Sequence, residues 1–372
     1  MNDDILKKIA AIAADNGLDA LVAASPENFA YLAGFVVPSH HILRWRHSML
    51  VVKPDASAAA FTVDMEESTV AGRLPGIPLT SWGEFTDNSM EVFAGLLRDL
   101  SLTQGRIGIE TDYLPARDLD ILKRALPKVE FVASQDLFNR ARMIKTEREL
   151  DLLKRLSRIS DQGIADALAG ASVGSSEMKM AADLTGGIYS RGAEDFKLMI
   201  IATGERSQLP NVGPSERLLA SGDICRVEIF SIIGGYHAGV CRTAYVDKPP
   251  DHAERIWAIL SDATCQLLEI IKPGASTREI YEAYLKMIAS LDMPPIAFVG
   301  HGIGLHLHED PYLGAQNDCA LEAGMVLGIE PLIYRTGYGF GLQNKDMVAV
   351  TDTGCTLVSD VSDTRSLIRC GG

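Results

Sequence analysis

The sequence lacks any long hydrophobic run. Its 372 residues contain no uninterrupted apolar stretch of about 18 residues, which is the length that a membrane-spanning helix needs. The basic residues that begin a signal peptide are also absent, because Asp3 and Asp4 stand in their place. We therefore expect a cytoplasmic protein that does not enter a membrane.

Cysteine is scarce, and basic residues are outnumbered by acidic ones. The six cysteines form no Cys-x-x-Cys pair, so neither a disulfide framework nor a zinc knuckle is indicated. The 35 basic residues face 49 acidic ones, which gives a formal net charge of −14. This charge opposes the phosphate contacts on which nucleic-acid binding depends. We expect no nucleic-acid partner.

The spacing of apolar residues predicts two α/β domains. Over residues 1–140, helical patterns such as that near 89–100 alternate with short extended apolar runs, which is typical of an α/β layer domain. Thr146 and Glu149 then form the capping box of a long helix. We place the domain boundary just before this helix, so that the second domain covers residues 141–372.

The second domain is predicted to have a strand-rich centre. Residues 223–237 predict a hairpin with apolar residues on both faces and a turn at the glycine pair 234–235. Glu228 is a carboxylate within this buried hairpin, and Glu330 ends another apolar strand just before Pro331. Two buried carboxylates cost several kcal/mol unless a cation faces them. We therefore expect a positively charged group or ion next to the two glutamates.

Three histidines stand close together in the glycine-rich segment 300–311. If the chain is extended there, His306 and His308 share one face, and His301 reaches the same cavity through the glycine turn. A glycine-rich apolar segment makes a poor solvent-facing surface. We therefore interpret the three imidazoles as site residues rather than as surface groups.

In this order, these segments resemble the signatures of the pita-bread family, which includes methionine and Xaa-Pro aminopeptidases, prolidase and creatinase. The matching segments are 222–223, 235–243, 300–311 and 324–331, and the stretch 28–35 resembles one in the family's auxiliary domain. The resemblance implies a pita-bread catalytic domain over 141–372 and a smaller α/β, creatinase-type N-terminal domain over 1–140.

The family's metallopeptidases hold two divalent ions with two Asp, one His and two Glu, and the resemblance maps these ligands onto five positions. His301 and Glu330 are retained, and Glu228 takes the first Asp position. Gly239 takes the second Asp position and Lys345 the last Glu position. The remaining side-chain charge is −1, which cannot balance two divalent ions. We expect no catalytic metal and no cofactor, and at most a weak single site at His301, Glu228 and Glu330.

Proton transfer has to come from a different group than in these relatives. Asn211 takes the place of the family's proton-transferring histidine, and an amide is neither an acid nor a base. His308 is favoured because it keeps the family's second histidine position, whereas His237 and His306 are candidates for substrate contact. Cys241, next to an arginine, suggests a nucleophile, although a free cysteine is more often a packing residue.

Creatinase hydrolyses a C–N bond without metal, and ectoine hydrolases open a cyclic amidine. The resemblance to this branch favours a metal-independent hydrolase of a C–N bond in a small polar zwitterionic amidine, guanidine or cyclic amide. Its catalytic residues would be Glu228, His301, His308, Glu330 and Lys345. Two alternatives stay open: a metal-dependent Xaa-Pro dipeptidase or lyase of the same fold, and an inactive protein that only binds peptides.

Pita-bread enzymes with an N-terminal domain usually form dimers in which the partner's N-domain overhangs the active site. The stretch 37–47 is rich in His, Arg and Trp and suits such a lid. Arg44 is our candidate for gripping a substrate carboxylate, and Trp45 for anchoring the interface. The expected partners are thus a small-molecule substrate and a second copy of the chain.

Overall fold

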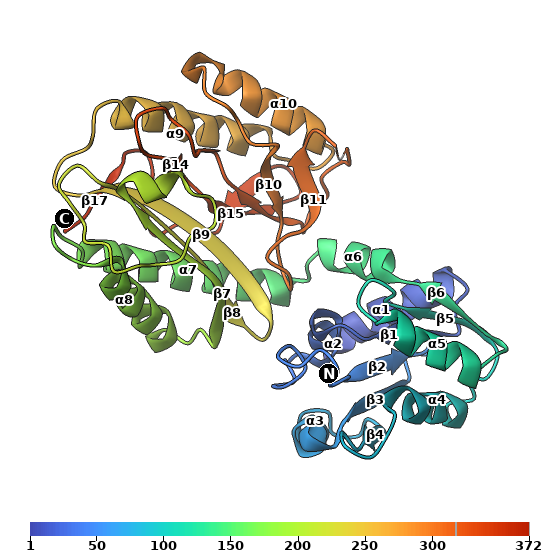
Figure 1. Ribbon diagram of the computed structural model, residues 1–372. Coiled ribbons are helices and arrows are strands. Elements are labelled where there is room, and N and C mark those ends of the chain that lie inside the picture. The colour runs from blue at the N-terminus through green and yellow to red at the C-terminus, as the bar shows by residue number, and fades with distance from the viewer. Residues whose placement is uncertain (317, 372) are drawn as a thin grey trace. The chain divides into compact units, whose positions relative to one another are not determined.

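The computed structural model describes residues 1–316 and 318–371 (Figure 1). The chain divides into two compact units, Met1–Arg142 and Met143–Gly372. Both units combine helices with strands, which confirms the predicted fold class. None of the helices in the described ranges is both long and apolar enough to span a bilayer.

The first unit is built on a six-stranded sheet with the order β4-β3-β2-β1-β5-β6. Its strands are β1 (Ala20–Ala23), β2 (Met49–Val52), β3 (Ala58–Val63), β4 (Leu79–Trp82), β5 (Gly105–Ile109) and β6 (Val129–Ala133). Its helices are α1 (Asp3–Asp15), α2 (Pro26–Ala33), α3 (Glu67–Arg73), α4 (Ser89–Asp99), α5 (Ala116–Ala125) and α6 (Gln135–Met143). Strands β1 and β2 are buried along their whole length, so they read as continuous apolar runs rather than as alternating patterns.

The second unit contains a four-stranded sheet, β17-β9-β8-β7, and a five-stranded sheet, β11-β10-β12-β15-β16, together with the pair β13-β14. The first sheet comprises β7 (Asp195–Thr203), β8 (Ile224–Ile233), β9 (Tyr236–Tyr245) and β17 (Ile368–Arg369). The other strands are β10 (Phe298–Gly302), β11 (Glu309–Gly314), β12 (Val326–Ile329), β13 (Leu332–Ile333), β14 (Leu342–Gln343), β15 (Asp346–Val350) and β16 (Cys355–Leu357). The long helices are α7 (Glu147–Ala169), α8 (Glu177–Ser190), α9 (Ala253–Ile270) and α10 (Thr277–Met287). Helices α7 and α8 lie along the sheet of β7 to β9, whereas α9 and α10 lie by the strands of the other sheet (Figure 1).

The predicted hairpin and helix start are both confirmed. Strands β8 and β9 are antiparallel, and Ile233 pairs with Tyr236 across the turn. Gly234 and Gly235 have φ angles of 58° and 86°, the positive values that a tight two-residue hairpin turn of type I′ requires. Thr146 forms the N-cap of α7 with both hydrogen bonds of the capping box.

The two sheets of the second unit are joined at Lys345. Cys241 of β9 and Lys345 exchange two backbone hydrogen bonds of 3.2 Å. The fully buried Arg242 guanidinium adds a side-chain link, because it donates to both carboxylate oxygens of Asp161 in α7, at 2.9 and 2.8 Å. It also lies 2.9 Å from Asp346 and donates to the carbonyl oxygen of Lys345 at 2.9 Å. The position of Lys345 therefore depends on this buried arginine.

Replacing Arg242 by Met is expected to lower the free energy of unfolding by about 3–5 kcal/mol, because two buried carboxylates lose their counter-ion. Urea unfolding followed by circular dichroism measures this change. The matched control is Arg158→Met, which removes an arginine whose ion pair with Asp360 is 51% and 38% exposed; it should cost less than about 1 kcal/mol. Equal losses in the two variants would contradict the role given to Arg242.

Candidate active site

Four charged or titratable side chains meet inside the second unit, and each comes from a different strand or strand end. Glu228 lies on β8 and His301 on β10, while Glu330 directly follows β12 and Lys345 directly precedes β15. All four are buried, with between 0% and 4% of their surface exposed. The structure thus brings together four of the five predicted catalytic residues.

The Lys345 ammonium lies at the centre of this cluster. Its Nζ is 3.3 Å from Glu228 Oε1, 3.6 Å from Glu330 Oε2 and 3.0 Å from His301 Nε2. Burial by itself would raise the pKa of Glu330, but the Lys345 ammonium and the neighbouring His301 and His308 together outweigh it and hold that pKa well below its usual range. The cation that the two buried carboxylates need is therefore supplied by the chain itself.

The hydrogen bonds of His301 determine where its proton lies. Nδ1 is 2.7 Å from the carbonyl oxygen of Gly302, which can only accept a hydrogen bond, so Nδ1 carries the proton. Nε2 faces the Lys345 ammonium, which can only donate, so Nε2 presents a lone pair. Glu330 Oε1 lies 3.2 Å from this same Nε2. Within the described ranges no group donates a hydrogen bond to that buried oxygen.

Two residues that the sequence analysis missed hold the carboxylates in place. Gln343 Nε2 donates to Glu228 Oε2 at 3.3 Å and to Glu330 Oε2 at 3.2 Å. Arg226 in turn donates to Gln343 Oε1 at 2.7 Å. Alternation along β8 puts Arg226 and Glu228 on one face, and this signal was available in the sequence. Gln343 stands two residues before Lys345, but nothing in the sequence indicates that its amide bridges the carboxylates.

A phenylalanine occupies the space next to the ammonium. Phe230 pairs with Gly239 across the hairpin, and a Cβ atom added at Gly239 would lie only 2.4 Å from the Phe230 ring. The Lys345 ammonium lies 4.3 Å from the centre of this ring, which is a cation–π contact. The chain thus has no room for a ligand side chain at position 239.

The fifth predicted catalytic residue, His308, lies at the more exposed edge of the cluster. Its ring stacks on His301 with a centroid distance of 3.8 Å and an interplanar angle of 25°. The loop before it is fixed by Glu309, whose Oε1 accepts hydrogen bonds from the backbone of Leu305 and His306 at 3.1 and 3.2 Å. Lys145 lies 3.4 Å from the other oxygen of Glu309. A buried ion pair therefore positions the loop that carries His308.

His306 belongs to the 304–309 loop, and His237 contacts this loop. The His237 backbone N–H donates to the carbonyl oxygen of Gly304 at 2.6 Å, and its Nδ1 is 3.3 Å from the same oxygen. Burial lowers the pKa of His237 to about 4, so its imidazole is neutral near pH 7. The contacts that place these two histidines are with this loop rather than with the Lys345 ammonium, and their role in substrate contact stays a prediction.

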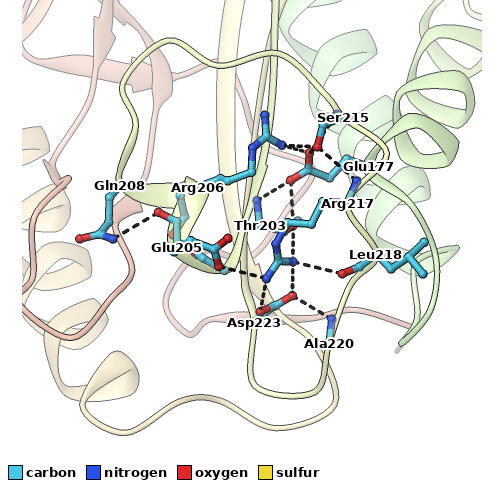
Figure 2. A network of polar contacts seen from close by, with 12 residues as sticks. Glu177, Thr203, Glu205, Arg206, Gln208, Ser215, Arg217, Leu218, Ala220 and Asp223 are labelled. Carbon is cyan, nitrogen blue, oxygen red and sulfur yellow. Dashed lines mark hydrogen bonds and ion pairs between the residues drawn. The ribbon is translucent and has the colours of Figure 1, made fainter.

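Asn211 lies in a segment that a polar network holds in place (Figure 2). The buried Glu177 carboxylate accepts hydrogen bonds from the backbone and side chain of both Thr203 and Ser215, and it pairs with Arg206. Figure 2 also shows Arg217 forming an ion pair with Asp223, with Nη1 2.5 Å from Oδ2. Asn211 itself is exposed. The segment reaches the cluster indirectly, because Arg226 donates to the carbonyl oxygens of Leu209 and Pro210.

The two remaining substrate-binding candidates are Cys241 and Arg44. The contacts that hold their side chains are with groups other than the Lys345 side chain. Cys241 is fully buried, and its Sγ lies 3.7 Å from the carbonyl oxygen of Gln343. Burial raises the pKa of this thiol, which disfavours the thiolate. Arg44 belongs to the first unit, where it donates to the carbonyl oxygen of Tyr113 at 3.1 Å.

The side chains do not fit a pair of metal ions. Gly239 offers no donor, and Lys345 places a positive charge among the remaining ones. A different set fits a single ion: His301, His308 and Glu330 each offer one donor atom, and these atoms lie within 4.8 Å of one another. The third donor expected from the sequence was Glu228, but the donor atoms that lie within 4.8 Å of one another are those of His301, His308 and Glu330.

Comparison with known proteins gives consistent matches over both units. Residues 151–352 match the metallopeptidase family M24, and residues 5–144 match the creatinase/prolidase N-terminal domain. A probable dipeptidase PepE of Mycobacterium tuberculosis is 30% identical over 94% of this chain and 92% of its own length. An Xaa-Pro dipeptidase of Pyrococcus horikoshii is 27% identical over 95% of this chain and 96% of its own. The prolidase structure from P. horikoshii covers 96% of this chain and 99% of its own, with 26% identity and a TM-score of 0.83.

These matches correct the expected reaction. The prediction of a metal-independent, creatinase-like or ectoine-hydrolase-like enzyme for an amidine, guanidine or cyclic amide is wrong, since the relatives are named as dipeptidases and prolidases. The remaining charge of −1 excluded a pair of ions and left at most a weak single site at His301, Glu228 and Glu330. That expectation left out His308, which supplies a third donor for a single ion next to His301 and Glu330.

Cys241 is expected to resist thiol reagents in the folded protein because it is buried and its pKa is raised. Ellman's reagent should modify the exposed Cys265 rapidly and reach Cys241 only on unfolding. Replacing Cys265 by Ser should remove the rapid phase, whereas Cys241→Ser should leave it intact. Rapid modification of Cys241 in the native protein would support the nucleophile interpretation instead.

Proposed function

Because this chain belongs to metallopeptidase family M24, we propose that it is a dipeptidase that cleaves Xaa-Pro dipeptides or closely similar short peptides. The names of the relatives support this substrate class. The observation that carries the proposal is the buried cluster of His301, Glu228, Glu330 and Lys345, with the more exposed His308 stacked at its edge. Such buried charges are costly for a protein that only needs to fold.

The cluster offers charges of both signs to a zwitterionic dipeptide. Glu228 and Glu330 are acceptors for a substrate ammonium, and Lys345 is a donor for the oxygen of the scissile carbonyl, where negative charge develops. The water that attacks the carbonyl gives up a proton, and this proton passes to the departing nitrogen. In an Xaa-Pro dipeptide that nitrogen carries no hydrogen, so cleavage requires this proton.

Purified full-length protein should release proline from a panel of Xaa-Pro dipeptides, measured with ninhydrin, both as isolated and after addition of manganese, cobalt or zinc. Non-proline dipeptides and Xaa-Pro tripeptides test the class and the length of the substrate. Failure to hydrolyse any peptide in all of these conditions would overturn the proposal. Tight peptide binding without turnover would then identify an inactive peptide-binding protein.

The Glu330→Gln variant is expected to lower kcat/KM by at least about 100-fold, because the amide cannot carry the negative charge of the carboxylate. The matched control is Glu282→Gln on the exposed face of α10, which should leave kcat/KM unchanged. Circular dichroism of both variants verifies folding. Retention of full activity in a folded Glu330→Gln variant would exclude Glu330 from catalysis.

The first unit carries a group of exposed apolar side chains that a second copy of the chain can cover, and we propose a homodimer on this basis. Ile42 is 68% exposed, Trp45 61%, Met65 61% and Phe85 88%. Trp45 and Arg46 both contact Glu84, which links the 39–47 loop to the segment that carries Phe85. Exposed apolar groups of this size mark interfaces in many soluble proteins.

A double variant, Trp45→Glu and Phe85→Glu, should convert the dimer into a monomer, since it places charges where apolar contacts are buried. Sedimentation velocity at micromolar concentration measures the change. The matched control is Met178→Glu in the second unit, a 45% exposed side chain outside this group. A wild-type protein that sediments as a monomer would contradict the proposal.

A further inference from the structure

We propose that this site takes one divalent ion rather than two, held by His301, His308 and Glu330, while Lys345 and Phe230 fill the second half of the site. The inference rests on the proposed function only for its catalytic use. The site itself follows from the lone pairs, charges and packing of the cluster, and ion binding is measurable without a substrate.

Two hydrogen-bond acceptors face each other in the cluster. His301 Nε2 presents a lone pair, because Nδ1 carries the proton that is donated to Gly302, and Glu330 Oε1 lies 3.2 Å away without a donor in the described part of the chain. Two lone pairs at this distance repel each other unless a cation lies close by. The Lys345 ammonium is 3.0 Å from Nε2 and 3.6 Å from the other Glu330 oxygen, so Oε1 is the carboxylate atom that stays open to an ion. The carbonyl oxygen of Gly302 fixes the ring in the orientation that a metal-binding imidazole needs.

The chemistry and spacing of the three donors fit a single ion. Two imidazoles and one carboxylate are the ligand set of many catalytic zinc sites, in which a fourth position stays open. The three donor atoms lie within 4.8 Å of one another. Two ligands of a tetrahedral zinc ion lie about 3.4 Å apart, since each bond is about 2 Å long. A shift of about 1.5 Å therefore closes the set, and the more exposed His308 is the ligand that can move.

Charge and packing limit the number of ions to one. Glu228, Glu330 and Lys345 together carry a charge of −1, so one divalent ion brings the site to +1 and two bring it to +3. The ring of Phe230 fills the space beside Gly239, where a second carboxylate would have to stand. The Lys345 ammonium lies against this ring and against Glu228, so it keeps these two partners when His301 and Glu330 bind an ion.

The experiment is equilibrium dialysis of the full-length protein against zinc, and separately manganese and cobalt, followed by plasma mass spectrometry. We expect one ion per chain in the wild type. The His308→Ala variant should bind the ion at least about 100-fold more weakly, since it loses a ligand. The matched control His306→Ala removes the neighbouring imidazole of the same loop and should keep one ion per chain. Two ions in the wild type, none, or equal affinities of the two variants would overturn the inference.

A triple variant tests whether Phe230 and Lys345 exclude a second ion. Phe230→Gly, Gly239→Asp and Lys345→Glu together remove the ring and the ammonium and add two carboxylates, so the ion content should rise from one to two. Circular dichroism verifies that the variant folds, and an unchanged content of one in the folded variant would contradict the inference.

Single-ion binding without peptide hydrolysis would leave the inference standing and reject the proposed function. Peptide hydrolysis by a protein that binds no ion would reject the inference and leave the proposed function standing.

Discussion

The contact on which the site depends is that of the Lys345 ammonium with Glu228, Glu330 and His301. Two carboxylates this deep in a protein need a positive charge at close range. The surrounding architecture serves to place that charge. The bridge between Cys241 and Lys345 joins the two sheets, and Arg242 ties the same backbone to α7. Folding of the second unit and assembly of the site are thus one process.

The polar groups around the cluster form a continuous chain that leads outward from it. Gln343 contacts both carboxylates, Arg226 contacts Gln343, and Arg226 also holds the backbone at Leu209 and Pro210. The segment after those residues is held by the Glu177 and Arg217 networks (Figure 2). A displacement of this segment would therefore be transmitted to the two carboxylates through Arg226 and Gln343. Side-chain networks of this kind restrict a site to one geometry.

The sequence predicted the fold well because the strongest signals are local. The glycine pair at 234–235 specifies the hairpin turn, and Thr146 with Glu149 specifies the start of α7. The motif positions also predicted Glu228, His301, Glu330 and Lys345 as neighbours. Gln343, Phe230 and the stacking of His308 on His301 could not be predicted, because they depend on which strands lie side by side. The reaction was mispredicted for a related reason: the charge count had no distances with which to test a single ion.

The close packing of Phe230 against Gly239 also has an evolutionary consequence. An aspartate at position 239 alone would collide with the ring, and loss of the ring alone would leave a cavity beside a buried ammonium. A glutamate at position 345 alone would add a third uncompensated carboxylate to the cluster. Each single step between this arrangement and a two-ion site is therefore unfavourable. The three positions are epistatic, and we expect them to vary together among homologous sequences.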